Sequence, residues 1–461
     1  MFKKIEIWIL YLTILLSILF VIGFGTLVRQ EIEGITKKGN ISISFLSEPA
    51  AYIARLPEQV ILKVFAPNPH QVSKLAVSKK DFYNLDGFSG TPNSEESYIL
   101  LSKYDGNLKE GVVELVDLRN FEVLHTWNPD IDAFNNLIEQ VDEFKYLNRD
   151  RNDARSLLNH PKLTQDGDLL FHFSTPLRKI DACSNLIFQS THDIFHHSTE
   201  IDIDGNIWVP SNLYPQTLPV EKVGRKIREE GGFLDDAIVK ISPEGKILFE
   251  KSVIQIFIDN GLEYLLFSVG NTTDPIHLND IQPVDFDGEY WRKGDVFLSV
   301  RHQSMVLLYR PSNNKIIWKG TGPLFHQHDV DILDNHRISI FNNNSKDFID
   351  RDTVDGHNEV IVYDFEIDEY SSYMKDSLVN NDVKTITQGL SQILSNGDLF
   401  IEETNYGRTL YFNADGSLRW THVNRADDGN IYQVGWSRIL YTQEDIQTVN
   451  NFINNKGTCN E

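Results

Sequence analysis

Five residues between positions 197 and 328 carry side chains that suit chemistry on an anion: His197, His277, Asn279, Arg301 and His328. The arginine guanidinium keeps its charge and presents a planar fork of donors to an oxyanion, and an asparagine amide donates without adding charge. A neutral imidazole, with a reference pKa of about 6.5, is a good nucleophile near neutral pH. Together these residue types indicate chemistry on a bound oxyanion.

Two of the histidines occupy the same place in a recurring sequence unit. His197 and His328 each stand eight residues before the turn that opens a short β-type run, and Gly389 holds this place in a third unit. His277 opens an intervening unit in the same way, with a longer turn. In a β-propeller the first strands of the units line a central channel, so we expect these histidines to face one another. Asp329 is expected either to orient an imidazole or to cap the turn.

Single histidines are more often structural residues with satisfied hydrogen bonds than functional ones. Two histidines in equivalent places, with a third histidine and an arginine between them, favour a functional site. The spacing of His326 and His328 would allow a shared metal, but no Asp, Glu or Cys pattern nearby has the spacing of a zinc site, so no metal is expected. The remaining histidines of this region are expected in supporting or surface positions: His196, His302, His326 and His336.

Short β-rich runs with Asp-Gly, Asn-Gly or Asp-Asn turns surround these residues from position 97 onward. Such a recurring meander unit favours a propeller over a sandwich. Six units begin near Ser97, Leu163, His197, His277, His328 and Gly389. A strand within Val434 to Tyr441 is expected to close the ring. The predicted fold class is therefore all-β, a six-bladed β-propeller with helical insertions.

The units average about 58 residues, which exceeds the roughly 40–50 residues of common propeller blades. Helical insertions explain the excess. They are predicted at Asp130 to Tyr146, at Glu221 to Glu230, and at Ser252 to Phe267 with Ser252 as N-cap. We expect such insertions on loops at one face of the ring, where they wall a site.

An uncharged apolar run from Ile7 to Val28 precedes everything else. As a helix it would span roughly 33 Å, enough for a bilayer core. Lys3 and Lys4 lie before it, so the positive-inside rule leaves the N-terminus in the cytoplasm and the main domain in the periplasm or outside the cell. A cleaved signal peptide is the alternative. We favour a retained single-pass anchor because the run exceeds a usual signal-peptide core of about 7–15 residues.

The chain has 461 residues and a net charge of −23, which excludes the basic footprint that nucleic-acid binding needs. Its two cysteines, Cys183 and Cys459, either form one disulfide or remain thiols. The expected division is a cytoplasmic tip with transmembrane helix at 1–29, a stalk and lead-in segment at 30–95, the propeller at 96–445 and a C-terminal tail at 446–461.

Several motifs, in the same order, resemble those of the bacterial arylsulfate sulfotransferases. They are HHSTEIDIDGNIWV (196–209), HLND (277–280), SVRHQS (299–304), HQHDVDILDN with ISIFNNN (326–344), and QGLSQILSNGDLFIEETNYGR (388–408). The resemblance implies a six-bladed propeller that moves a sulfuryl group from a phenolic sulfate ester to a phenolic acceptor. It implies no nucleotide donor, cofactor or metal.

The same resemblance implies a role for each residue of the opening set. His328 falls on the family's nucleophile, which is transiently sulfated. His277 and Asn279 fall on its sulfate-binding His-x-Asn, Arg301 on its arginine, and His197 on a further histidine. We therefore expect His328, His277 and Arg301 to be catalytic, and Asn279, His197 and Arg301 to bind substrate.

The chain departs from the family in its apparent membrane anchor, in the lack of a substantial N-terminal β-domain, and in Asn335-His336-Arg337, which replaces an Asn-Gly or Asp-Gly turn. These departures concern oligomeric state and substrate more than fold. Two other functions fit the same pocket. One is a non-catalytic cell-surface propeller that binds anionic aromatic or sugar ligands, and the other is an aryl-sulfate hydrolase.

Overall fold

The computed structural model describes residues 6–32, 46–47, 49–54, 74–76, 84–139, 141, 144, 147–192, 194–214, 216–218, 233–268, 274–347, 352–456 and 459. The chain forms two compact units, Met1–Val72 and Ser73–Glu461. In the first unit, helix α1 (Ile7–Ile32) is long and apolar enough to cross a membrane, as predicted. Most of the predicted stalk and the whole predicted helix at 221–230 lie outside the described residues.

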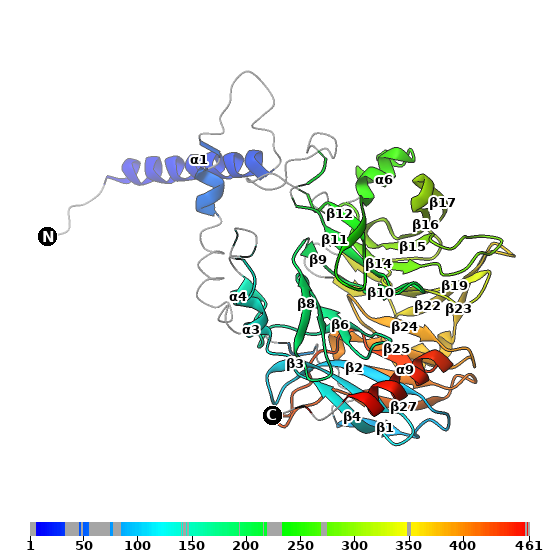
Figure 1. Cartoon of the computed structure of the whole chain (residues 1–461). Helices are drawn as coiled ribbons and strands as arrows, with labels where there is room; N and C mark the ends of the chain where they lie inside the picture. The colour runs from blue at the N-terminus through cyan, green and yellow to red at the C-terminus, as the bar shows by residue number, and fades with distance from the viewer. Residues whose placement is uncertain are drawn as a thin grey trace. The chain divides into compact units, whose positions relative to one another are not determined.

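The second unit is the predicted propeller of six antiparallel blades, which follow one another from cyan to orange in Figure 1. Blade 1 consists of β28 (Arg438–Leu440), β2 (Tyr98–Asp105), β3 (Glu110–Asp117) and β4 (Glu122–Trp127). Blade 2 consists of β5 (Asn159–Leu163), β6 (Leu169–His172), β7 (Leu177–Ile180) and β8 (Leu186–Ser190). Blade 3 consists of β10 (Glu200–Ile201), β11 (Ile207–Asn212), β12 (Asp236–Ile241) and β13 (Ile247–Ser252), with β9 (Ile194–Phe195) pairing with β11.

The other three blades follow the same order, with the first strand innermost. Blade 4 consists of β14 (Leu278–Pro283), β15 (Val296–Val300), β16 (Met305–Arg310) and β17 (Lys315–Gly320). Blade 5 consists of β18 (Val330–Ile332), β19 (Arg337–Asn342), β22 (Glu359–Asp364) and β23 (Glu369–Tyr373), with the hairpin β20 (Ser345–Asp347) and β21 (Asp352–Val354). Blade 6 consists of β24 (Leu390–Ile393), β25 (Leu399–Glu403), β26 (Arg408–Phe412), β27 (Leu418–Val423) and β1 (Gly87–Gly90).

The ring closes inside blade 1, where the late strand β28 pairs with the early strand β2. Apolar layers between neighbouring blades form the core; Phe297 and Leu308 of blade 4, for example, pack in one cluster with Ile338 and Ile340 of blade 5. Each such fully buried side chain contributes about 1.5–3 kcal/mol. Closure and interblade packing together fix where the inner strands begin.

Buried acidic side chains add polar links between strands of neighbouring blades. Asp236 accepts the backbone N–H of Leu278, at 2.9 Å. Asp280 accepts that of Val330, at 3.0 Å, and Asp329 that of Ser391, at 3.1 Å. The bonds of Asp280 and Asp329 join consecutive inner strands, and they set the height of one inner strand against the next.

The helices sit mainly in loops between blades or between strands. They are α3 (Ile131–Asn135), α4 (Leu147–Asp150), α6 (Val253–Asp259), α7 (Glu263–Leu266), α8 (Lys375–Asn380) and α9 (Gln443–Asn455). Ser252 is the N-cap of α6, as predicted, but Gly261 with φ of 74° separates α6 from α7. The single helix predicted at 130–146 is wrong. There α3 ends at Asn135, whose side chain bonds to Arg151 and Arg178.

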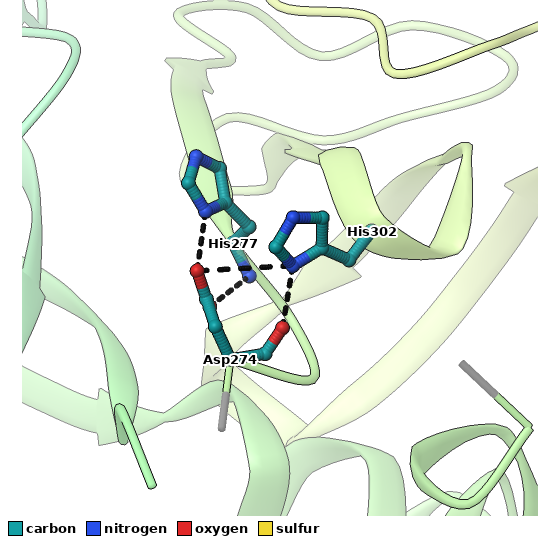
Figure 2. A group of neighbouring side chains, drawn as sticks. All are labelled: Asp274, His277 and His302. Atoms are coloured by element: carbon teal, nitrogen blue, oxygen red, sulfur yellow. Dashed lines mark hydrogen bonds and ion pairs between the residues drawn. The ribbon is translucent and has the colours of Figure 1, made fainter. Parts of the chain in front are cut away.

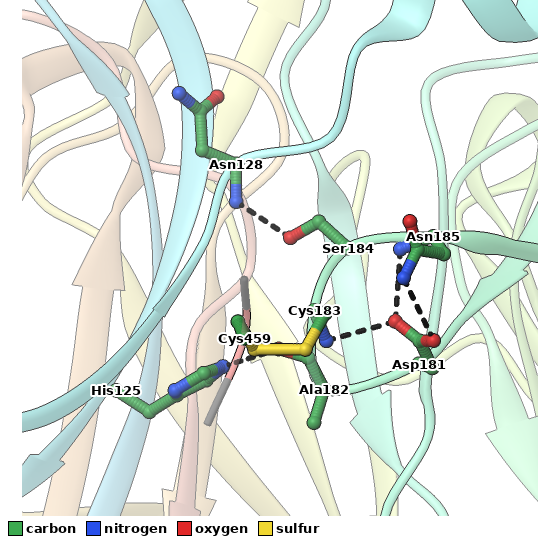
Figure 3. The surroundings of a disulfide bond; sticks show 8 residues. All are labelled: His125, Asn128, Asp181, Ala182, Cys183, Ser184, Asn185 and Cys459. Carbon is green, nitrogen blue, oxygen red and sulfur yellow. Dashed lines mark hydrogen bonds between the residues drawn. A yellow bond between two sulfur atoms is a disulfide. The ribbon is translucent and has the colours of Figure 1, made fainter. Parts of the chain in front are cut away.

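The C-terminal segment is tied to blades 1 and 2. Thr442 starts α9 with a capping box, and Phe452 of this helix packs 5.1 Å from the ring of Trp127 on β4. Beyond α9, Cys459 forms a disulfide with Cys183 in the turn between β7 and β8 (Figure 3). This pairing answers the question about the two cysteines that the sequence left open.

Three blades share the register that the sequence comparison used. Ile201 pairs with Ile207, Ile332 with Ile338, and Ile393 with Leu399, and each first partner lies four residues after the compared position. The turns differ in backbone: Gly205 and Gly397 have φ of 81° and 87°, whereas His336 has no positive φ. Asp334 instead accepts the N–H groups of His336 and Arg337, so blade 5 makes this turn without glycine.

Candidate active site

Side chains suited to chemistry lie at one end of the inner strands. His197 lies three residues before β10, His277 directly before β14, and His328 two residues before β18. Arg301 follows β15, next to β14 in the same blade. Left-handed backbone at His197 and His277, with φ of 58° and 53°, turns the chain from the preceding loop into the strand. The propeller thus delivers all four residues to the same end of the ring.

The histidines converge, and His197 lies between the others. Its ring centroid is 5.1 Å from that of His277 and 6.1 Å from that of His328. A further ring, His302, lies 4.5 Å from His277. We call His197, His277, His302, His328 and Arg301 the histidine cluster. Its His277 side chain is 28% exposed, whereas His328 is 1% exposed.

The protonation of His328 follows from its two partners. Its Nδ1 lies 2.7 Å from Oδ1 of Asn343, and its Nε2 accepts the backbone N–H of Gln388 at 2.9 Å. Asn343 is oriented because its Nδ2 donates to the carbonyl of Gln388 at 2.8 Å, so its Oδ1 must accept. His328 therefore carries a proton on Nδ1 and a lone pair on Nε2, the tautomer that attack by Nε2 requires.

Arg301 and His277 are joined through Asp274. Nη1 of Arg301 lies 2.7 Å from Nε2 of His302, whose Nδ1 lies 2.5 Å from the backbone oxygen of Asp274. The Asp274 carboxylate lies 2.5 Å from Nδ1 of His277 and accepts the His277 backbone N–H at 3.1 Å. Figure 2 shows both imidazoles directed at Asp274. Because a guanidinium only donates, the chain of donors runs from Arg301 through His302 to Asp274.

Asn279 is fully buried on β14. Its Nδ2 donates to the backbone carbonyl of Gln327 at 2.8 Å, which ties blade 4 to the residue that precedes His328. A side-chain amide has two N–H donors, so one remains beyond this contact. A role in binding an oxyanion stays a prediction for Asn279.

A family model for arylsulfotransferases (ASST) matches residues 160–425, more than half of the chain and all of the residues above. The chain belongs to the arylsulfotransferase family. No curated protein matches it. Among solved structures, a protein of unknown function from Bacteroides caccae is 13% identical, with 75% of this chain and 99% of that chain covered and a TM-score of 0.44. Virginiamycin B lyase from Staphylococcus aureus is 11% identical, with 57% and 69% covered and a TM-score of 0.33. We draw nothing from likenesses of this size.

Burial and neighbouring positive charges lower the pKa of three imidazoles in the histidine cluster of this arylsulfotransferase-family chain, those of His197, His302 and His328. Burial and the charges of His196, His277 and His328 hold the pKa of His197 well below its ordinary value. Burial and Arg301 do the same for His328. The pKa of His302 is lowered by burial and by His277. The sequence-based expectation of an imidazole with its ordinary pKa therefore does not hold for His328, whose lone pair stays available at lower pH.

Further along the same inner strands lies a second group, the carboxylate cluster. It consists of Glu200, Asp280, Asp329 and Asp331 with the cations Lys162 and Arg438. Lys162 lies 2.6 Å from Glu200, which also pairs with Arg438. Burial and the charge of Glu200 raise the pKa of Asp280 to about 8 and that of Asp331 to about 6. The cluster is distinct from the family's predicted site residues.

Two groups of described side chains have ligand atoms close enough together to share a metal ion. They are Asp274, His277 and His302, and His336, Asp364 and Glu366. In the first group, hydrogen bonds already account for Nδ1 of both histidines. In the second, Nδ1 of His336 bonds to Asp364 at 3.0 Å and Glu366 is exposed. These contacts need no metal, and His326 and His328 belong to neither group.

Sequence reasoning missed two members of the site, Asp274 and Asn343, whereas His302 was expected in a supporting or surface position and supports Arg301. His302 was placed outside the recurring position, although it directly follows Arg301. Asn343 lies in a run of three asparagines that follows β19, which is a usable signal for a polar loop end. Asp329 does not contact an imidazole; it accepts the N–H of Ser391 and links two blades.

Proposed function

We propose that this chain is an aryl-sulfate sulfotransferase. It moves a sulfuryl group from a phenolic sulfate ester to a phenolic acceptor through a sulfohistidine at His328, without a nucleotide donor. The observation that carries the proposal is the state of His328, a buried neutral imidazole with Nδ1–H held by Asn343 and Nε2 as the lone pair. Membership of the arylsulfotransferase family supports the same activity.

In the first half-reaction, Nε2 of His328 gives up the N–H of Gln388 and attacks the ester sulfur. The bond between sulfur and the aryl oxygen breaks, and its electron pair leaves on the phenolate. Arg301 and Asn279 hold the non-bridging oxygens, on which charge is spread in the transition state. The local donors attract the anionic ester although the chain as a whole carries a net charge of −23.

A second histidine, His277 or His197, gives its proton to the departing phenolate. In the second half-reaction the acceptor phenol returns a proton to that histidine while its oxygen attacks the same sulfur. The nitrogen–sulfur bond breaks and His328 recovers its lone pair. Each cycle thus consumes one ester and one phenol and leaves the protein unchanged, with ping-pong kinetics.

The test uses the full-length chain in detergent micelles with 4-nitrophenyl sulfate, with and without phenol. We expect nitrophenol release that depends on phenol and is matched by phenyl sulfate. Without phenol, the peptide that contains His328 gains the mass of one sulfuryl group. His328→Gln abolishes both signals, whereas His336→Gln, a change in the same blade outside the histidine cluster, preserves both.

Two outcomes overturn the proposal. Release that ignores phenol, with inorganic sulfate as the product, identifies a hydrolase. No release at all, with 4-nitrophenyl sulfate bound equally by the native chain and by His328→Gln, identifies a binding propeller.

We further place the propeller outside the cytoplasm, with α1 retained as the anchor. Lys3 and Lys4 before α1 support this orientation, and the Cys183–Cys459 disulfide fits an oxidising compartment. Protease added to intact spheroplasts should degrade the propeller, and mass spectrometry of the purified chain should recover peptides from before Ile7. A protected propeller contradicts the orientation, and a chain that starts beyond α1 contradicts retention.

A further inference from the structure

Asp274 lies outside every motif that the sequence suggested, yet it contacts two members of the histidine cluster. Its carboxylate lies 2.5 Å from Nδ1 of His277, and its backbone oxygen lies 2.5 Å from Nδ1 of His302. The side chain is 9% exposed. A buried carboxylate against an imidazole nitrogen is the arrangement that fixes the tautomer of a proton-transferring histidine.

These contacts decide which nitrogen atoms face the substrate. His277 donates Nδ1–H to Asp274, so its Nε2 is the atom left for a ligand. His302 donates Nδ1–H to the backbone, so its Nε2 accepts from Arg301. Asp274 therefore holds the His277 imidazole directly and the arginine of the histidine cluster through His302.

The two candidate proton donors differ in their partners. His277 has a carboxylate oxygen directly at its Nδ1, the arrangement that orients a proton-transferring imidazole. Nδ1 of His197 lies instead 2.8 Å from Nδ1 of His196, and burial with three neighbouring histidines holds the pKa of His197 well below its ordinary value. Burial alone would raise the pKa of Asp274, but the hydrogen bond from His277 and the charges of both histidines hold it below its ordinary value.

We propose that Asp274 is the positioning residue that makes His277, rather than His197, the histidine that exchanges a proton with the phenolic oxygens, while His302 holds Arg301 on the sulfuryl group. The inference rests on the proposed sulfotransferase function. In the first half-reaction the proton moves from Nε2 of His277 to the leaving phenolate, and in the second it moves back from the acceptor phenol. Asp274 stays ionised throughout.

A series of aryl sulfates with leaving phenols of increasing pKa, from 4-nitrophenyl to phenyl to 4-methoxyphenyl sulfate, tests this assignment on the full-length chain. A weak leaving group needs the proton and a strong one does not. For Asp274→Asn we expect a loss of about 10²-fold or more in kcat/KM on phenyl sulfate and little loss on 4-nitrophenyl sulfate. For His302→Leu we expect a similar loss on every ester, because binding of the sulfuryl group by Arg301 does not depend on the leaving group.

A matched control is Asp364→Asn, because Asp364 contacts His336 at 3.0 Å in the same kind of pair outside the histidine cluster. It should leave the whole series unchanged. Equal losses for Asp274→Asn on all esters reduce Asp274 to a structural role and overturn the proposal. So does full loss of native activity with a chelator and recovery with Zn²⁺ alone, which would make Asp274, His277 and His302 metal ligands.

The failure of this assignment can be told apart from the failure of the proposed function. If the native chain labels His328 but Asp274→Asn shows no selective loss, only the assignment to His277 fails. If the native chain neither labels His328 nor transfers sulfuryl groups to phenol, the proposed function fails and the series cannot be measured.

Discussion

The histidine cluster and the carboxylate cluster occupy successive levels of the same inner strands, and they are built on opposite principles. Glu200, Asp280 and Asp331 each lie three residues after His197, His277 and His328 respectively. The histidine cluster has one arginine among imidazoles, and burial keeps the imidazoles of His197 and His328 neutral. The carboxylate cluster has four acidic side chains and two cations, and both cations pair with Glu200.

This difference separates binding from assembly. In the histidine cluster the Arg301 guanidinium lies beside an imidazole nitrogen rather than a carboxylate, so its charge is available for an anion. In the carboxylate cluster, Glu200 on β10 forms ion pairs with Lys162 on β5 and with Arg438 on β28. These two ion pairs join three blades. Substitutions in the histidine cluster should therefore alter activity, and substitutions in the carboxylate cluster should alter stability.

The largest expected effect is on stability, from Arg438→Met. Removal of this cation leaves Glu200 with Lys162 alone beside Asp329 and Asp331, which costs about 3–5 kcal/mol because buried charges lose their partner. The measurement is urea unfolding of the full-length chain in detergent. The double variant Glu200→Gln with Arg438→Met should recover part of the loss. An unchanged unfolding midpoint for Arg438→Met would show that the carboxylate cluster does not hold the blades together.

The next effect is on activity, from Arg301→Met. Loss of one guanidinium on the sulfuryl oxygens should lower kcat/KM by about 10²–10³, which is the usual cost of one oxyanion donor. Arg301→Lys should restore little, because an ammonium lacks the planar fork. The melting temperature should stay close to that of the native chain. A large drop in the melting temperature of Arg301→Met would show that Arg301, like Arg438, mainly supports stability.

The sequence predicted the fold because turns and strand lengths recur, and a repeat needs no long-range information. The register that aligned His197, His328 and Gly389 is the register of the inner strands. It predicted convergence at one end of the ring, since equivalent strand positions in a closed ring must meet there.

Contacts between loops could not be predicted in this way. Asp274 reaches His302 across 28 residues, and Asn343 reaches His328 across 15, through loops whose paths no periodicity encodes. The disulfide joins residues 276 positions apart and depends on where α9 packs. The helix predicted at 130–146 failed for a related reason: the bonds of Asn135 to Arg151 and Arg178 are tertiary contacts, and they override a helical stripe.

The smallest expected effect is on the pH dependence of stability, where the two clusters have opposite signs. Between about pH 4 and 8 the folded chain keeps a proton on Asp280 that an unfolded carboxyl, with a pKa near 3.9, has released. Stability therefore falls as pH rises through this window. His197 and His328 are neutral when folded but protonated when unfolded below about pH 6.5, so they lower stability as pH falls.

The variant Asp280→Asn tests the contribution of Asp280 to this pH dependence. An asparagine oxygen still accepts the N–H of Val330, but the side chain carries no titrating proton. Melting temperatures of the native chain should decline on both sides of about pH 6. In Asp280→Asn the decline between pH 6 and 8 should shrink, while the decline on the acidic side, which arises from buried histidines inside and outside the histidine cluster, should remain. If the variant declines as steeply as the native chain toward pH 8, the proton does not reside on Asp280, and the raised pKa belongs to another member of the carboxylate cluster.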